Sequence, residues 1–124
     1  MNNSKLRLHF YRNINNKSLI EDFFYSLDKK VRAKILVYIN MLISQGGRLK
    51  FPYARHMEDK IWELRVDFDK NFYRIFYFIF DGEKIILLHG FNKKTNKTSS
   101  KEISKAKNYY KDYLINLNDQ SYEL

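Results

Sequence analysis

Two arginines near the middle of the chain have the surroundings that most clearly suggest chemistry. Arg74 lies in the most apolar stretch of the sequence, with Phe72 and Phe76 on its side of an expected strand. A buried guanidinium is costly unless it is paired, so Arg74 either pairs with an acidic neighbour or binds an anion. Arg65 shares a strand face with Glu63, which is the pattern of an ordinary surface ion pair. The residues alone leave both interpretations open.

A dense block of lysines follows these arginines. Between positions 92 and 111 the acidic residue is Glu102, and the lysines are Lys93, Lys94, Lys97, Lys101, Lys105, Lys107 and Lys111. Arginine binds two phosphate oxygens at once and lysine supplies a point charge, so both suit a phosphate-bearing ligand. Adjacent lysines also lower each other's pKa, which favours a general-acid role. An ordinary solvated turn explains Lys93 and Lys94 equally well.

The overall charge also indicates an anionic partner. The 124 residues carry a formal net charge of +9 and suit a single domain over positions 1–124. Nucleic acid, an anionic membrane surface or an acidic protein would each satisfy this excess, and an evenly spread lysine surface is the alternative.

Several kinds of site are disfavoured. The chain has no cysteine, and its histidines at positions 9, 56 and 89 are far apart, so we expect no disulfide, metal or cofactor site. The first ten residues contain no apolar segment of a signal peptide, and the longest apolar run, Ile75–Phe80, is too short to span a bilayer. We therefore expect a cytoplasmic protein with no membrane partner.

The elements that would hold these residues follow from periodicity and capping. Residues 5–11 alternate between apolar and polar side chains, as in an amphipathic strand. Ser18 and Glu21 form a capping box that begins a first helix. Asp28 can cap a second helix that ends at the glycine pair 46–47, so a helix hairpin is predicted.

The second half of the chain predicts a small sheet. After an irregular link over residues 48–59, three strands are expected at Ile61–Val66, Phe72–Phe80 and Lys84–Phe91. The middle strand is apolar on both sides, which indicates a central strand covered on both faces. A last helix follows residue 99. The order of N-terminal strand, helix hairpin, three-stranded antiparallel meander and C-terminal helix predicts an α+β fold.

Two sequence runs carry a family resemblance. Residues 61–65 (IWELR) with 73–77 (YRIFY) resemble the core of the RelE/ParE superfamily of type II toxins. Residues 87–98 (LLHGFNKKTNKT) resemble the HigB-like, phage-derived branch, and the pattern continues into the last helix. The resemblance covers the order of elements in the whole chain and implies a RelE-like fold.

The resemblance also implies a function. Toxins of the HigB-like branch usually cut messenger RNA on the ribosome, without a cofactor, and are encoded beside a neutralising HigA-like antitoxin with a helix-turn-helix domain. The implied partners are therefore this antitoxin, the ribosome and mRNA. Because the superfamily also contains gyrase poisons, a ParE-like inhibitor is one alternative, and a non-catalytic RNA-binding remnant of a phage module is another.

RNA cleavage of this type uses the 2′-hydroxyl as the nucleophile, and the protein neutralises the phosphorane and moves protons. The resemblance implies catalytic roles for Arg65 and Arg74, and Lys93 and Lys94 at the end of a strand are further catalytic candidates. By residue type and charge, the candidate RNA-binding residues are Tyr73, Lys97, Thr98, Lys101 and Lys105. His89 and Glu63 are candidate acids or bases, although a packed histidine is the more ordinary explanation of His89.

The chain departs from RelE where proton transfer is assigned. RelE has basic residues where this chain has Ile61 and Glu63, and a tyrosine where this chain has only Thr98 or Ser99 nearby. The identities of the acid and the base therefore do not carry over. Trp62 and Tyr73 are candidates to stack on a base, but core packing explains Trp62 better.

Overall fold

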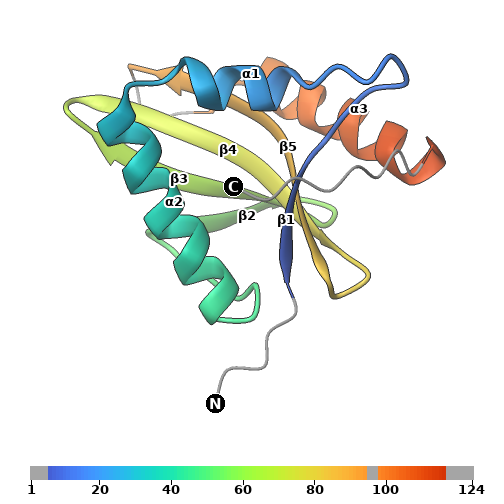
Figure 1. Cartoon of the computed structure of the whole chain (residues 1–124), viewed down its shortest axis with the longest axis horizontal. Helices are drawn as coiled ribbons and strands as arrows, with labels where there is room; N and C mark the ends of the chain where they lie inside the picture. Colours follow the sequence, from blue (N-terminus) through green and yellow to red (C-terminus); the bar gives the residue numbers. More distant parts are fainter. Residues whose placement is uncertain (1–5, 95–97, 117–124) are drawn as a thin grey trace.

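The computed structural model describes residues 6–94 and 98–116, which form five strands and three helices (Figure 1). The first half comprises β1 (Arg7–Phe10), α1 (Leu19–Ser26) and α2 (Lys29–Ser44). The second half comprises β2 (Ala54–Glu58), β3 (Ile61–Phe68), β4 (Asn71–Phe80), β5 (Lys84–Lys93) and α3 (Ser100–Asn116). The α+β class predicted from the sequence is confirmed.

The strands form one sheet in the order β1-β5-β4-β3-β2. Neighbours from β2 to β5 are antiparallel, and β1 pairs in parallel with β5. The predicted three-stranded meander is therefore a four-stranded one, and the prediction of an irregular link over residues 48–59 was wrong. Because β2 is a short edge strand with mostly exposed side chains, it lacks the apolar alternation that reveals a strand.

The helix ends are confirmed by their capping interactions. Ser18 Oγ accepts a hydrogen bond from the Glu21 amide at 3.1 Å, and Asp28 Oδ1 accepts one from the Lys30 amide at 2.8 Å. After α2, Gly46 and Gly47 have φ of 65° and 85°, a left-handed conformation that glycine adopts without strain and that ends the helix.

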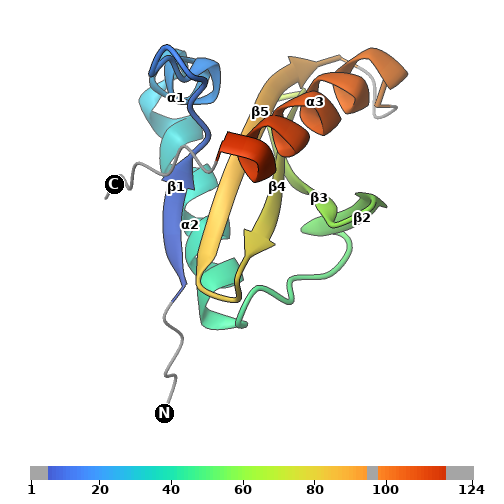
Figure 2. The ribbon, with the colours of Figure 1, turned by 90° about the vertical axis from the view of Figure 1, so that its right-hand side faces the viewer.

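Helices cover both faces of the sheet. The side chains of α1 and α2 form one core with Leu64, Ile75 and Leu87, whereas α3 packs against the other face over Phe76 and Phe78. The side view shows α1 and α2 on one side of the sheet and α3 crossing β5 on the other (Figure 2). The strand β4 lies at the centre and is covered on both faces, as its sequence predicts.

Two details of β5 shape its two faces, namely a bulge in its pairing with β4 and a glycine that faces α1. The register with β4 shifts by one residue, since Phe76 pairs with His89 and Tyr77 with Leu87. This bulge sets the side-chain alternation of the strand beyond it. Gly90 permits the close approach of α1, because a Cβ atom there would lie 2.6 Å from the ring of Phe23.

The described part of the chain contains no helix long and apolar enough to cross a membrane.

Candidate functional site

A group of charged side chains lies on the α3 face of the sheet, near the start of α3. We call it the cationic cluster, and its members are Arg55 of β2, Glu63 and Arg65 of β3, Arg74 of β4, Lys93 of β5 and Thr98 before α3. Strand pairing brings them together, because Arg55 is opposite Glu63 and Arg65 is opposite Arg74. Five of the six residues were site candidates from the sequence.

Glu63 organises one side of the cluster. Its side chain is fully buried, and its Oε1 accepts hydrogen bonds from Arg65 Nη1 at 3.0 Å and Arg55 Nη2 at 3.5 Å. Its Oε2 accepts a 2.6 Å hydrogen bond from the Thr98 hydroxyl. A carboxylate with donors on both oxygens is held in place and shielded from substrate. This arrangement favours a positioning role for Glu63 over the candidate role as an acid or base.

Lys93 is the residue of the cluster best suited to give up a proton. Its Nζ donates to Thr98 Oγ1 at 2.8 Å. Burial, and secondarily the nearby arginines, lower the pKa of Lys93 from 10.5 to about 8, although Glu63 acts in the opposite direction. The sequence prediction ascribed such a shift to the neighbouring Lys94, but the causes are burial and the arginines of other strands. A lysine with this pKa is a suitable general acid near neutral pH.

Arg74 is fully buried and makes the ion pair that the sequence left open. Its Nη1 donates to Asp67 Oδ1 at 2.8 Å and to the Tyr73 carbonyl at 3.0 Å. The guanidinium also lies 5.4 Å from the ring centroid of Phe72. These contacts fix a positive charge between Arg65 and Lys93, where it adds to the anion-attracting field of the cluster.

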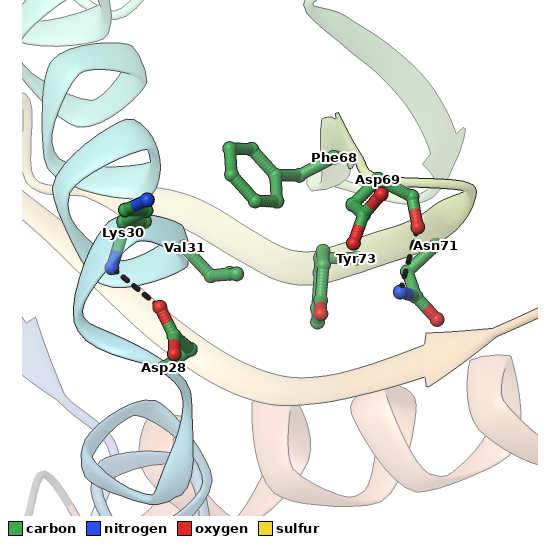
Figure 3. A pocket seen from close by; sticks show the side chains of 7 residues that line it. All are labelled: Asp28, Lys30, Val31, Phe68, Asp69, Asn71 and Tyr73. Carbon is green, nitrogen blue, oxygen red and sulfur yellow. Dashed lines mark hydrogen bonds between the residues drawn. The ribbon is translucent and has the colours of Figure 1, made fainter.

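Two residues predicted to act with these arginines lie elsewhere. Lys94 is not part of the cluster, and its Nζ donates to Asn71 Oδ1 at 2.6 Å beside the β3–β4 turn. Tyr73 is on the opposite face of β4 from Arg74, where it packs in the core of α1 and α2. It lines a groove of about 590 Å³ between α2 and the β3–β4 turn. Figure 3 shows Tyr73 beside Phe68 in this groove.

His89 is a packed and hydrogen-bonded residue. Its Nε2 lies 2.8 Å from Glu102 Oε1 in the first turn of α3, and its ring is 5.6 Å from that of Phe91. Burial lowers the pKa of His89 despite the opposing influence of Glu102. Four strand positions separate His89 from Lys93, which is roughly 13 Å along the chain. His89 therefore joins β5 to α3 and stands apart from the cationic cluster.

The lysines of α3 extend the positive charge beyond the cluster. Lys101 and Lys105 are exposed, and Lys105 Nζ is 4.0 Å from a Glu102 carboxylate oxygen. Lys107 is partly exposed and lies 3.7 Å from Glu58. The predicted RNA contact Lys97 falls outside the described residues. Lys101 and Lys105 lie in the first two turns of α3, which begins beside Thr98, so an extended anion could contact both regions.

Two residues at this site were not predicted from the sequence. Arg55 was hidden in the expected irregular link, and its side chain is 44% exposed next to the buried Glu63. Phe51 precedes β2, and its ring centroid is 5.2 Å from the Arg65 guanidinium carbon. Neither residue has a local signal, because only the pairing of β2 with β3 brings this segment to the site. Among the described residues, no group of three or more histidine, aspartate or glutamate side chains could hold a metal ion.

Comparison with known families places this site in context. Residues 22–111 match the family described as phage-derived protein Gp49-like (DUF891). The chain belongs to this Gp49-like family. The family is part of the RelE-like toxin group, so this level of the resemblance is confirmed. The match runs from α1 into α3 and includes the whole cationic cluster. No curated protein matches the chain.

Proposed function

We propose that this Gp49-like protein is the toxin of a type II toxin–antitoxin system and cuts mRNA on the ribosome. The observation that carries the proposal is the convergence of Arg55, Arg65 and Lys93 around the buried Glu63, with Arg74 close enough to Lys93 to lower its pKa. The stability of the fold does not require such a cluster, because buried ion pairs contribute little net stability. Binding of an anionic substrate would explain why these positive charges are gathered at one site.

The proposed reaction is an attack of a 2′-hydroxyl on the adjacent phosphorus. The new bond joins the 2′-oxygen to phosphorus, the bond to the 5′-oxygen breaks, and the products carry a 2′,3′-cyclic phosphate and a 5′-hydroxyl. Arg55 and Arg65 would neutralise the phosphorane oxygens, with Arg74 adding its field. Lys93 would give its proton to the departing 5′-oxygen, while the 2′-hydroxyl proton passes to solvent.

The charge outside the cluster supports a large nucleic-acid partner. Lys101 and Lys105 are exposed on α3, and Lys94 lies on the neighbouring turn. Lysines spread in this way contact phosphates without reading sequence, and they suit ribosomal RNA better than a small substrate. The same surface would attract an acidic segment of a HigA-like antitoxin, which would neutralise the toxin by covering the cluster.

Inducible expression with and without the adjacent gene, followed by mapping of RNA 5′ ends, tests this function. We expect growth arrest, new 5′ ends inside translated messages, and rescue by the adjacent gene. Arg74→Ala, expressed and folded to the same level, should lose both effects. Growth arrest with intact messages and trapped DNA breaks would instead show a gyrase inhibitor. RNA binding without arrest or cleavage would show a non-catalytic remnant.

A further inference from the structure

Phe51 is an exposed aromatic side chain at the edge of the cationic cluster. Phe51 is 65% exposed, and it belongs to neither of the hydrophobic clusters formed by the described residues. The Arg65 guanidinium carbon lies 5.2 Å from its ring centroid. Arg65 is in turn held by Glu63 at 3.0 Å, so the ring sits next to a fixed cation rather than a mobile surface residue.

Other exposed aromatic side chains in the described part of the chain have ring partners. Tyr25 packs edge-on against Phe24 with centroids 5.1 Å apart, and Tyr53 packs against Tyr38 at 5.5 Å. Phe51 has no such ring partner among the described residues. Packing therefore accounts for Tyr25 and Tyr53, but it does not account for the position of Phe51.

The aromatic residues that the sequence offered for base stacking do not reach the cluster. Tyr73 lies on the other face of the sheet, and Trp62 packs at the core of α1 and α2 with its ring 5.4 Å from that of His56. An RNA strand whose phosphate rests on Arg55, Arg65 and Lys93 would instead meet Phe51. Bases stack on aromatic faces in many single-stranded RNA sites, and an adjacent arginine adds to the interaction.

We propose that Phe51 forms a stacking subsite for one nucleobase of the RNA strand whose phosphate binds at Arg55 and Arg65. The subsite rests on the proposed function, because it needs RNA at the cluster. It orients the nucleotide next to the cleaved bond and gives the enzyme a preference for purines, whose larger rings stack more strongly. Phe51 is thus a specificity-determining residue rather than one that transfers a proton.

The test compares Phe51→Ala, Phe51→Leu and Phe51→Trp with the wild-type chain in a purified translation reaction on a defined message. Tyr25→Ala is the matched control, since it also removes an exposed aromatic ring but from a helix that does not contribute to the cluster. Cleavage rates are measured at each mapped site. Thermal unfolding of all variants shows whether each chain is folded.

We expect Phe51→Ala to lower cleavage about 5- to 150-fold at sites with a purine beside the cut, and less at other sites. Phe51→Leu should resemble Phe51→Ala, because leucine is apolar but has no π face. Phe51→Trp and Tyr25→Ala should cut like the wild type. The Phe51 variants should keep nearly the wild-type unfolding temperature, because Phe51 is outside the core.

Three results would overturn the inference. They are wild-type cleavage by Phe51→Ala, full activity of Phe51→Leu, and an equal loss at every site, which would indicate a displaced Arg65 instead of a lost stack. In each case cleavage by the wild type would leave the proposed function intact. If the wild type itself cut no message, the proposed function would fail and the stacking subsite with it.

Discussion

The two faces of strands β3, β4 and β5 are built from alternate residues of the same segments, yet they differ in kind. On the α1–α2 face, Leu64, Ile75 and Leu87 are fully or almost fully buried in a continuous apolar core. On the α3 face, Phe76 and Phe78 pack under the helix, but the strand ends carry the cationic cluster. The larger core lies on the α1–α2 face, and the α3 face holds a smaller core beside the charged residues.

This difference separates the residues that stabilise the fold from those that would act on a substrate. Burial of Lys93, and secondarily the arginines near it, lowers its pKa, so its charged form works against folding. Proteins keep such arrangements where activity requires them, at some cost in stability. Substitutions in the cationic cluster should therefore affect cleavage, and those in the apolar core of the α1–α2 face should affect stability.

Lys93→Met should have the largest effect on activity. Methionine keeps the apolar stem of Lys93 but cannot give a proton to the leaving oxygen, so cleavage should fall about 10²- to 10⁴-fold. Because burial disfavours the charged lysine, the free energy of unfolding at neutral pH should stay the same or rise. Cleavage in a purified translation reaction and urea unfolding measure the two quantities. Unchanged cleavage by a folded variant would remove Lys93 from the mechanism.

Ile75→Ala should show the opposite pattern. Ile75 neighbours Arg74 in sequence but is fully buried on the α1–α2 face. Truncating a buried isoleucine to alanine leaves a cavity and should lower the free energy of unfolding by about 2–5 kcal/mol. Cleavage per folded molecule, measured well below the unfolding temperature, should remain near wild type. A stable variant that has lost cleavage would contradict the separation of the two faces.

The pH dependence of cleavage should show the titration of Lys93. The acid acts in its protonated form, which predominates below the pKa of about 8 and is lost above it. Single-turnover cleavage on preformed ribosome–message complexes should therefore decline as pH rises through about 8, by roughly tenfold for each further pH unit. Peptide-bond formation on the same ribosomes is the control. A rate that stays constant between pH 7 and pH 9 would exclude Lys93 as the acid.

Thr98→Val should have the smallest effect. Valine keeps the shape of threonine but removes the hydroxyl that links Lys93 at 2.8 Å to Glu63 at 2.6 Å. Loss of this link should lower cleavage about 2- to 15-fold, the equivalent of one or two ordinary hydrogen bonds. Thr98→Ser restores the hydroxyl and should recover most of the activity. Equal activities of the Val and Ser variants would show that the hydroxyl does not position Lys93.

Much of the fold was accessible from the sequence because its signals are local. The caps at Ser18 and Asp28 and the two-sided apolar pattern of β4 each predicted an element that the structure contains. The edge strand β2 was missed, because its identity depends on pairing with β3. Arg55 and Phe51 were missed for the same reason.

Which residues belong to the cationic cluster depends on the direction of each side chain as well as on its type. Arg65, Arg74, Lys93 and Thr98 were recognised by type and by the family resemblance, and the structure brings them together. Strand alternation places Tyr73 and Arg74 on opposite faces of β4, so this separation was available from the sequence. Which of Lys93 and Lys94 joins the cluster was not available from the sequence, because it depends on the β5 register beyond the bulge at His89.

The most direct test of the proposed reaction is a message with a single 2′-deoxynucleotide immediately 5′ of a mapped cut. The substitution leaves the phosphate and the base in place and removes only the proposed nucleophile. In a purified translation reaction the wild-type chain should cut the all-RNA message to products with a 2′,3′-cyclic phosphate and a 5′-hydroxyl, and should leave the modified bond intact. Cleavage of the modified bond, or products with a 5′-phosphate, would contradict a 2′-hydroxyl attack at the cationic cluster.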